Sequence, residues 1–334
     1  MSDLSTIRWG ILGTGKIARK FAHDVKAAAP GAELKAVGSR KRETAESFGD
    51  EYGIPNRHAS YEQLAADPDV DVVYVATPHP WHKEATLLCL EAGKAVLCEK
   101  AFAMNADQAR AMVSLAREKN LFLMEAMWTR FRPAMVKLRE LIAEGKIGEI
   151  QMVNASIGWL GGNDYSHRLY AKELGGGILL DGTVYPISFA SMLLGQPSQI
   201  ASAAVLGKAG TDEQEAISFG YPSGAVANLI GSIRATPANN AVVVGTKGRI
   251  EVATRWWEPQ QITLFVNGED PQVFDFPEDG TVGYQYEAIA VGESLRAGKT
   301  ESEIMSLDES IAIMETMDAL RAQWGLTYDA DGKA

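Results

Sequence analysis

The sequence has little cysteine, a deficit of basic charge and no obvious membrane segment. Among 334 residues only Cys89 and Cys98 are cysteines, which is too few for a disulfide framework and typical of small buried residues. Lys and Arg total 32 against 43 Asp and Glu, giving a formal net charge of −11. This acidic balance disfavours nucleic-acid and anionic-membrane binding, because both need basic surfaces.

Signals for secretion, membrane insertion and metal binding are missing as well. The first six residues form a short, polar segment before the first predicted strand, so we expect no signal peptide. No apolar run looks long enough to span a bilayer. No Cys/His cluster has the spacing of a zinc site, and we expect no metal. A cytoplasmic location is therefore the default expectation.

The first third of the chain alternates short apolar runs with helical patterns. Such alternation predicts right-handed crossovers and a parallel, doubly wound sheet of the Rossmann type. Strands are predicted at 8–12, 34–39, 70–76, 95–98 and 121–124, and helices at 16–29, 42–52, 81–92 and 106–118. Because 334 residues are too many for one ordinary core, we predict two domains: a nucleotide-binding domain over 1–127 and a second domain over 128–334.

The remainder is rich in strands after a connecting helix at 132–144. Strands are predicted at 150–157, 200–206, 215–221, 225–233, 241–244, 249–252 and 262–266, and helices at 183–194, 284–297 and 306–324. Turn signals such as Pro222-Ser223-Gly224 and Asn267-Gly268 separate the strands. The predicted fold class is therefore α/β, with a Rossmann domain followed by an open, mostly antiparallel sheet against which the last helices pack.

A glycine fingerprint follows the first predicted strand and begins the first helix. It reads Gly13-Thr14-Gly15-Lys16-Ile17-Ala18, the G-x-G-x-x-G/A pattern in the strand-turn-helix context that it requires. Gly13 permits the tight turn, Gly15 lets the backbone approach a pyrophosphate, and the helix N-terminus offers free N–H groups. The pattern predicts dinucleotide binding; the alternative is a plain strand-to-helix turn.

The end of the second strand indicates which dinucleotide binds. NAD proteins usually have an acidic residue here, which binds the ribose 2′-hydroxyl. This chain instead has Ser39 and Arg40, with no carboxylate before Glu43. A hydroxyl and a guanidinium suit a 2′-phosphate, so we predict NADP(H). Lys41 and Arg42 fit a solvated loop equally well.

Candidate site residues follow two further strands. Thr77, Pro78, His79 and His82 follow the strand at 70–76, at the edge where open α/β sheets bind ligands. Each histidine fits a packing or capping role as well as a functional one. Lys100 ends the strand at 95–98 after Glu99. It suits proton transfer at a carbinol oxygen if its pKa is lowered, and it equally suits a surface pair with Glu99.

The second half contains one unusual stretch, a glycine triplet at 175–177 that leads to Asp181 and Tyr185. The glycines would let the backbone approach a ligand closely. Asp181 and Tyr185 are four residues apart, hence on one face of a helix. A carboxylate and a phenol there suit substrate binding and proton transfer. The alternative is an N-capping Asp and a packed Tyr.

Together these motifs resemble the Gfo/Idh/MocA oxidoreductase family along essentially the whole chain. The resemblance rests on the fingerprint at 13–18, Ala76-Thr77-Pro78-His79 with His82, Ala92-Gly93-Lys94 before Glu99-Lys100, and the glycine-rich run into Asp181. It implies a Rossmann domain and a second domain whose sheet joins subunits, hence a homodimer or homotetramer.

Within that family the chain is similar to the dimeric dihydrodiol dehydrogenase group, which includes NADP-dependent D-xylose dehydrogenases. The stretch 124–131 and a tyrosine at position 185 carry this similarity. It implies proton chemistry by Lys100 and Tyr185, and a substrate site formed by Asp181, Trp128, Arg130 and His79. The residues expected to bind the cofactor are Gly13, Thr14, Gly15, Lys16, Ile17, Ser39, Arg40, Thr77, Pro78, His79, His82, Glu99 and Lys100. The expected substrate is a small sugar, cyclic polyol or trans-dihydrodiol.

One position departs from the family pattern. Members usually have proline after the lysine, whereas this chain has Ala101. A cis bond before a residue other than proline costs roughly 2.5–4 kcal/mol. We therefore predict a trans bond between Lys100 and Ala101.

Two other functions remain open from the sequence. One is an NAD-dependent dehydrogenase of inositol-like polyols, which Ser39-Arg40 disfavours. The other is a dinucleotide-binding regulator without catalysis, which the presence of Glu99-Lys100 and of Asp181 with Tyr185 disfavours. Comparing NAD with NADP across a panel of sugars and diols distinguishes all three.

Overall fold

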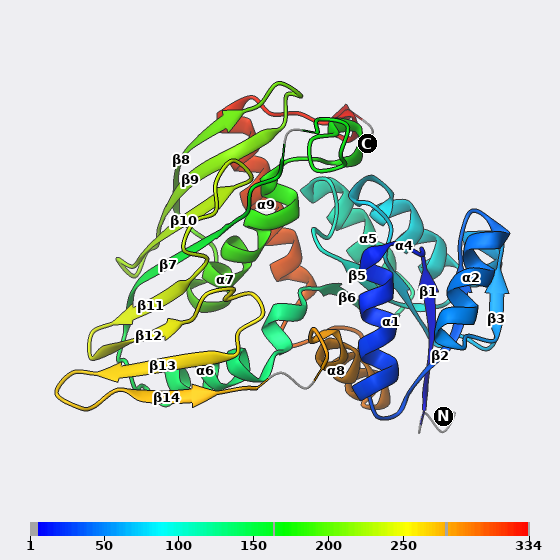
Figure 1. The fold of residues 1–334 in the computed structure, drawn as a ribbon, viewed down its shortest axis with the longest axis horizontal. Coiled ribbons are helices and arrows are strands. Elements are labelled where there is room, and N and C mark those ends of the chain that lie inside the picture. The colour runs from blue at the N-terminus through cyan, green and yellow to red at the C-terminus, as the bar shows by residue number, and fades with distance from the viewer. Residues whose placement is uncertain (1–5, 163, 278–279, 333–334) are drawn as a thin grey trace. The chain divides into compact units, whose positions relative to one another are not determined.

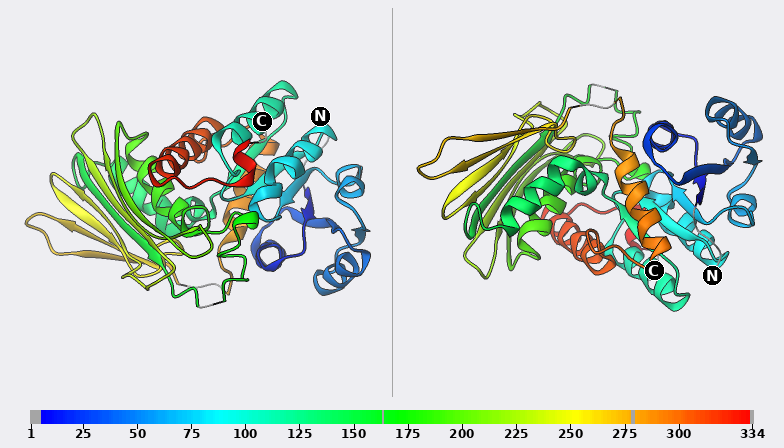
Figure 2. Two further views of the ribbon diagram at one scale, coloured as in Figure 1. Left: turned by 90° about the horizontal axis from the view of Figure 1, so that it is seen from above. Right: turned by 90° about the horizontal axis from the view of Figure 1, so that it is seen from below.

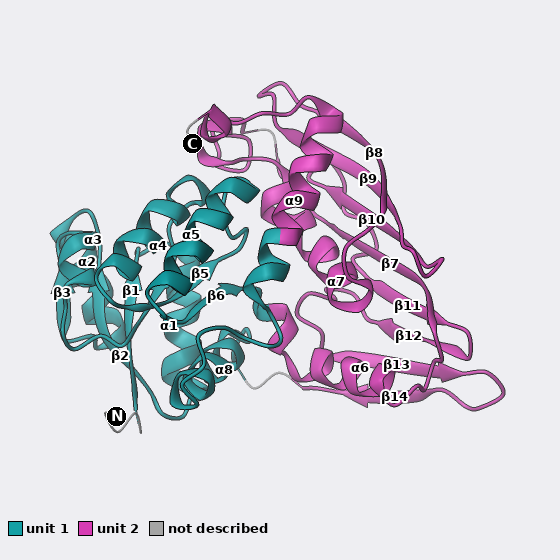
Figure 3. Cartoon of the chain, turned by 180° about the vertical axis from the view of Figure 1, so that it is seen from behind, with its two compact units in different colours: residues 1–128, 280–311 teal, residues 129–279, 312–334 magenta. Residues whose placement is uncertain are grey.

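A computed structural model describes residues 6–162, 164–277 and 280–332. The chain divides into two compact units (Figure 3), one formed by 1–128 with 280–311 and the other by 129–279 with 312–334. The chain first leaves unit 1 after Trp128, one residue beyond the predicted limit of 1–127. Residues 280–311 also belong to the first unit, although the prediction assigned all of 128–334 to the second domain. The signal-peptide prediction concerns residues that lie mostly outside the described part.

Unit 1 contains a parallel six-stranded sheet in the order β3-β2-β1-β4-β5-β6 (Figure 1). Its strands are β1 (Ile7–Leu12), β2 (Ala32–Gly38), β3 (Asn56–His58), β4 (Val72–Val75), β5 (Ala95–Glu99) and β6 (Leu123–Ala126). The helices between them are α1 (Lys16–Ala28), α2 (Arg42–Tyr52), α3 (Tyr61–Ala65), η1 (His79–Trp81), α4 (His82–Glu91) and α5 (Ala106–Glu118). The predicted Rossmann architecture is confirmed; β3 and α3 were not predicted.

The strand register brings the predicted nucleotide-binding loops to one edge of this sheet. Leu12 at the end of β1 pairs with Gly38 on one side and with Val75 on the other. Val75 in turn pairs with Cys98 of β5. The loops that follow these four strands therefore begin at the same level, at the carboxyl edge where α/β sheets bind ligands.

The return segment is held to unit 1 by a buried carboxylate. Asp24 of α1 is fully buried, and its Oδ2 accepts the N–H groups of Val282, Gly283 and Tyr284 at 2.9, 2.8 and 3.0 Å. These groups lie at the start of α8 (Tyr284–Arg296), whose N-cap residue is Gly283. One side chain thus satisfies three N–H groups that a helix start leaves without partners.

Unit 2 contains an eight-stranded sheet in the order β14-β13-β12-β11-β7-β10-β9-β8. Its strands are β7 (Ile150–Gly158), β8 (Gln199–Leu206), β9 (Asp212–Gly220), β10 (Val226–Ser232), β11 (Ala241–Gly245), β12 (Gly248–Val252), β13 (Gln261–Val266) and β14 (Gln272–Asp275). All neighbours are antiparallel except β7 and β10, which are parallel. The predicted mostly antiparallel sheet is confirmed, with β14 added.

Helices cover one face of this sheet and leave the other bare (Figure 2). They are α6 (Pro133–Ala143), α7 (Val184–Leu194) and the part of α9 (Leu307–Trp324) that belongs to unit 2. Short helical turns lie at η2 (Trp128–Phe131), η3 (Lys172–Leu174), η4 (Leu179–Thr183) and η5 (Asp329–Gly332). Because α7 is apolar on nearly all sides, it forms the centre of the unit 2 core.

One apolar stretch was missed in the sequence. The helical run Lys172–Leu194 has 23 residues and is long and apolar enough to cross a membrane by length and composition alone. The expectation that no run is long enough is therefore wrong. However, 72% of its most apolar window is buried inside the protein, as is typical of a core helix.

Candidate functional site

The loop between β1 and α1 forms an open cradle. Gly13 has φ +107°, and a Cβ there would lie 2.8 Å from the carbonyl oxygen of Ala76, so only glycine fits this turn. Gly15 is the N-cap of α1 with no side-chain cap bond, and a Cβ on it would meet nothing within 4 Å. Thr14 and Ile17 are half-buried and Lys16 is exposed. The first N–H groups of α1 are therefore accessible to an anion.

Beyond β2, the predicted residues Ser39 and Arg40 differ in exposure. Ser39 is buried, and its hydroxyl bonds to the Thr44 hydroxyl. Arg40 is exposed, and its guanidinium carbon lies 5.9 Å from the ring centroid of Trp81. Burial raises the pKa of Tyr61, while the charge of Arg40 and its bond to the Tyr61 hydroxyl lower it. Two aromatic residues thus flank this guanidinium.

The sequence did not identify Trp81 and Tyr61 as neighbours of Arg40. Trp81 is 39% exposed, which is unusual for so large an apolar side chain. It belongs to the Pro78-to-His82 motif, so its position beside a ligand-binding loop was a signal that could have found it. Tyr61 lies in α3, which the sequence did not predict.

His82 links the loops after β4 and β5. It is fully buried, with Nε2 2.8 Å from the Thr77 carbonyl and Nδ1 2.9 Å from the Ala101 carbonyl. Burial lowers the pKa of His82. The ring of His79, itself buried, meets the His82 ring edge-on at 5.5 Å. His82 therefore lies between the loops after β4 and β5 and contacts a backbone carbonyl of each.

The predicted catalytic Lys100 follows directly on β5 and is half-buried. Its backbone N–H donates to the Glu99 carboxylate at 3.2 Å, and that carboxylate also accepts the Tyr74 hydroxyl. The Glu99 side chain is buried, so these contacts lie inside the protein.

The prediction of a trans bond between Lys100 and Ala101 is wrong, because the bond is cis. The preference of an isolated peptide does not decide the geometry here, because tertiary contacts hold the segment. The Ala101 carbonyl faces His82, and the Phe102 N–H donates to the Glu125 carboxylate at 3.1 Å.

Two predicted substrate residues lie where the chain passes from unit 1 to unit 2. Trp128, the last residue of unit 1, stacks on Tyr284 with a centroid distance of 4.8 Å and an interplanar angle of 24°. Arg130 in unit 2 is 2% exposed. Its Nε donates to the Ser188 hydroxyl at 2.9 Å and its Nη2 to the Ser188 carbonyl at 2.6 Å. Arg130 thus anchors η2 to α7.

Asp181 and Tyr185 lie on a π-helical turn and the helix that continues it. Asp181 is inside η4, and its carboxylate pairs with the exposed Arg168 guanidinium at 3.0 Å. Tyr185 is in the first turn of α7 and is buried. The predicted capping alternative is not seen, because Thr183 rather than Asp181 is the N-cap of α7.

The glycine triplet before η4 serves packing. A Cβ on Gly177, which has φ +118°, would overlap the Asp212 carboxylate of β9. A Cβ on Gly176 would lie 2.8 Å from the Ala171 nitrogen. The interpretation that these glycines admit a ligand is therefore corrected at both positions, because protein atoms occupy the space.

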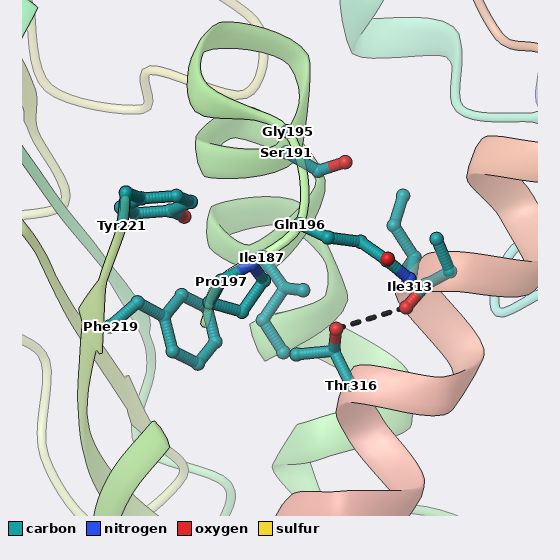
Figure 4. A pocket seen from close by; sticks show the side chains of 10 residues that line it. Ile187, Ser191, Gly195, Gln196, Pro197, Phe219, Tyr221, Ile313 and Thr316 are labelled. Atoms are coloured by element: carbon teal, nitrogen blue, oxygen red, sulfur yellow. Dashed lines mark hydrogen bonds between the residues drawn. The ribbon is translucent and has the colours of Figure 1, made fainter. Parts of the chain in front are cut away.

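A pocket in unit 2 is separate from these residues (Figure 4). It is a partly open hollow between α7, the end of β9 and α9, and its lining includes Ile187, Phe219, Tyr221 and Thr316. Burial raises the pKa of Tyr221 to about 12. No predicted site residue lines this pocket. Among the described residues no acid, His or Cys group is arranged for a metal ion.

A Rossmann sheet, an open phosphate loop after β1 and a lysine after β5 at the same edge of the sheet are typical of a dinucleotide-dependent oxidoreductase. Sequence models of this class match both parts of the chain. The "oxidoreductase family, NAD-binding Rossmann fold" model matches 7–127, and the "GFO/IDH/MocA C-terminal domain" model matches 135–251. The chain belongs to the Gfo/Idh/MocA oxidoreductase family, as its motifs indicated.

Similar proteins span nearly the whole chain. Trans-1,2-dihydrobenzene-1,2-diol dehydrogenase from Mus musculus is 40% identical over 97% of this chain and 99% of its own length. KijD10, a 3-ketoreductase from Actinomadura kijaniata in complex with NADP and TDP-benzene, superposes with TM-score 0.81 at 27% identity, covering 95% and 97% of the two chains. Aldose-aldose oxidoreductase from Caulobacter crescentus superposes with TM-score 0.86 at 25% identity, covering 96% and 98%.

Proposed function

We propose that this protein is an NADP(H)-dependent dehydrogenase or reductase of CH–OH groups in a small sugar, cyclic polyol or trans-dihydrodiol. The observation that carries the proposal is an open phosphate loop at Gly13–Gly15 in the same unit as the exposed guanidinium of Arg40. The names of the relatives, which include a dihydrodiol dehydrogenase and a ketoreductase complexed with NADP, support it.

The residues at the carboxyl edge of unit 1 fit such a nucleotide. The exposed Gly15 leaves room for a pyrophosphate, and the start of α1 supplies N–H donors. Arg40 supplies positive charge for a ribose phosphate, and its aromatic neighbour Trp81 offers a flat apolar surface. Thr77, His79 and Lys100 follow β4 and β5 at the carboxyl edge of the sheet, where the nicotinamide end of the nucleotide is expected to bind. When bound, the nicotinamide accepts or supplies the hydride.

The chain's own part in the chemistry is to bind the substrate and to move one proton. In this proposal Tyr185 takes the proton of the substrate hydroxyl during oxidation and returns it during reduction. The positive charge of Lys100 supports that transfer because it stabilises the deprotonated oxygen of the Tyr185 phenol. Asp181 accepts a hydrogen bond from a second substrate hydroxyl, and Trp128, Arg130 and His79 complete the substrate site.

The first test is an assay of NADP and NAD reduction with aldoses, cyclitols and trans-diols. We expect NADP to be reduced with at least one class, and much more efficiently than NAD. Reduction of NAD alone with cyclitols would favour the inositol-type enzyme, and no reduction with any substrate would favour the regulator.

Two substitutions test the proton chemistry. Lys100→Met and Tyr185→Phe should each lower kcat by about 10²–10⁴-fold, and Tyr185→Phe should leave NADP affinity unchanged. Lys20→Met and Tyr165→Phe are matched controls at exposed positions. Normal turnover in both site variants would refute the assignment.

The bare face of the unit 2 sheet supports a further part of the proposal, a homodimer or homotetramer. Met152, Val226 and Ile230 on β7 and β10 are 37%, 39% and 45% exposed, and such apolar surface favours a subunit contact. Ile230→Asp should shift the mass measured by light scattering towards that of the monomer. If the wild type and the variant are both monomers, the proposed oligomer is contradicted. We also propose a cytoplasmic location.

A further inference from the structure

Two carboxyl groups buried in unit 2 take no part in the chemistry proposed above. Asp212 and Glu215 of β9 are 0% and 2% exposed. Regular alternation would direct residues three apart to opposite faces of a strand. However, Val205 and Leu206 of β8 pair with Gln214 and Asp212, so β9 contains one extra residue between them. This bulge redirects the chain and lets both carboxyl groups face the interior.

Asp212 holds the beginning of η4. Its Oδ2 accepts the N–H of Leu179, the first residue of that turn, at 2.6 Å. The Tyr328 hydroxyl lies 3.4 Å from Asp212 Oδ1 and donates to the Gly176 carbonyl at 2.7 Å. Because Gly177 has no side chain, the backbone before η4 can pass directly over this carboxylate.

Glu215 lies at the other end of the same turn. Thr183 is the last residue of η4 and the N-cap of α7, but its hydroxyl makes no capping bond. That hydroxyl lies over Gly231 of β10, where a Cβ would overlap it and would lie 3.4 Å from Glu215 Oε2. Glycine at 231 therefore makes room for Thr183 beside Glu215.

Burial makes both carboxyl groups harder to ionise than an exposed acid. Burial raises the pKa of Asp212. Burial and the neighbouring charge of Asp212 raise the pKa of Glu215 well above its ordinary value, and the Thr183 hydroxyl opposes this only in part. The charge of Asp212 disfavours a second charge on Glu215. Whatever the charge of the pair, Asp212 is the residue whose Oδ2 accepts the Leu179 N–H.

We propose that Asp212 is a positioning residue that holds the beginning of η4 and thereby fixes Asp181 and Tyr185. Asp181 follows the held residue Leu179 by two positions, and Tyr185 lies in the first turn of the helix that continues η4. A single π-helical turn is uncommon and is found frequently at functional sites. The consequence for catalysis rests on the roles proposed above for Asp181 and Tyr185, whereas the structural consequence does not.

Amide hydrogen exchange tests the structural part without any substrate. Asp212→Ala removes the acceptor of the Leu179 N–H, and loss of this buried bond should speed exchange there about 10–100-fold. Asp212→Asn keeps an acceptor, and Glu215→Gln leaves the Asp212 acceptor in place, so both should stay close to the wild type. Unchanged exchange at Leu179 in Asp212→Ala would overturn the proposal, as would an equal rise throughout unit 2.

Turnover tests the catalytic part, with Glu213→Gln as the matched control. Glu213 is an acid on the same strand, but its carboxylate lies 3.9 Å from Arg234 instead of facing η4. Asp212→Ala should lower kcat about 10-fold or more with the KM for NADP unchanged, and Asp212→Asn should restore it. A raised KM for NADP with unchanged kcat would overturn this part. If the wild type reduces NADP with no substrate while Leu179 exchange behaves as predicted, the proposed function fails and the positioning role stands.

Discussion

Replacing Arg40 tests the nucleotide preference most sharply. In Arg40→Ala the guanidinium beyond β2 is lost, while the phosphate loop at 13–15 is untouched. A bond between a charged donor and a phosphate contributes about 1.5–3 kcal/mol, and each 1.4 kcal/mol is about tenfold in affinity. Arg40 is exposed, so solvent screening places the loss in the lower part of this range. We expect kcat/KM for NADP to fall about 10–30-fold.

The value for NAD should stay within about twofold, because NAD has no 2′-phosphate for the guanidinium to bind. The assay is therefore the ratio of kcat/KM for the two nucleotides, at fixed ionic strength. Arg42→Ala is the control: it removes the same charge two residues away, where Arg42 is exposed and pairs with Glu46 at 3.6 Å. Equal losses for NADP and NAD, or an equal effect of Arg42→Ala, would refute the reasoning.

Two further predictions concern stability. Asp24→Ala leaves three N–H groups at the start of α8 without their acceptor, so the free energy of unfolding in urea should fall by about 2–4 kcal/mol; a fall below about 0.5 kcal/mol would show that the carboxylate does not hold the return segment. Burial raises the pKa of Glu287 well above its ordinary value of 4.5. The native state therefore keeps a proton that the unfolded state loses, so this group's contribution falls as pH rises above about 4.5. Glu287→Gln should be less pH-sensitive in thermal unfolding and gain stability relative to the wild type from pH 5 to pH 8; parallel curves would contradict this.

Much of the fold could be predicted because its signals are local. The strands β1, β4 and β5 are short apolar runs, and helices such as α1 and α5 have a repeating apolar face. The elements that were missed lack such signals: Asn56–His58 forms a three-residue strand without apolar residues. The return of 280–311 to unit 1 depends on bonds between Asp24 and residues about 260 positions away, which no local pattern reveals.

The candidate site could be predicted only where a motif corresponds to a backbone requirement. Gly13 has the backbone role expected of it, because its positive φ and the nearby Ala76 carbonyl admit only glycine, and Gly15 leaves the start of α1 open as expected. The glycines at 176 and 177 follow the same logic but face Ala171 and the Asp212 carboxylate. The spacing of glycines in the sequence indicates where the backbone passes close to other atoms. It does not show whether those atoms belong to a ligand or to the protein.

The cis bond after Lys100 and the buried acids on β9 depend on tertiary contacts. The segment at Ala101 is held by His82 from another loop, and the bulge that turns Asp212 inward depends on the register of β8 with β9. Neither arrangement has a counterpart in the composition or periodicity of the chain.

The most direct measurement is NADPH formation by the purified protein with a trans-dihydrodiol, an aldose or a cyclitol. Wild type, Tyr185→Phe and Lys100→Met are compared at saturating NADP. The account predicts turnover in the wild type with at least one substrate class and a loss of about 10²-fold or more in both variants, with NADP still bound. Turnover that survives both substitutions, or a wild type that binds no NADP, would contradict it.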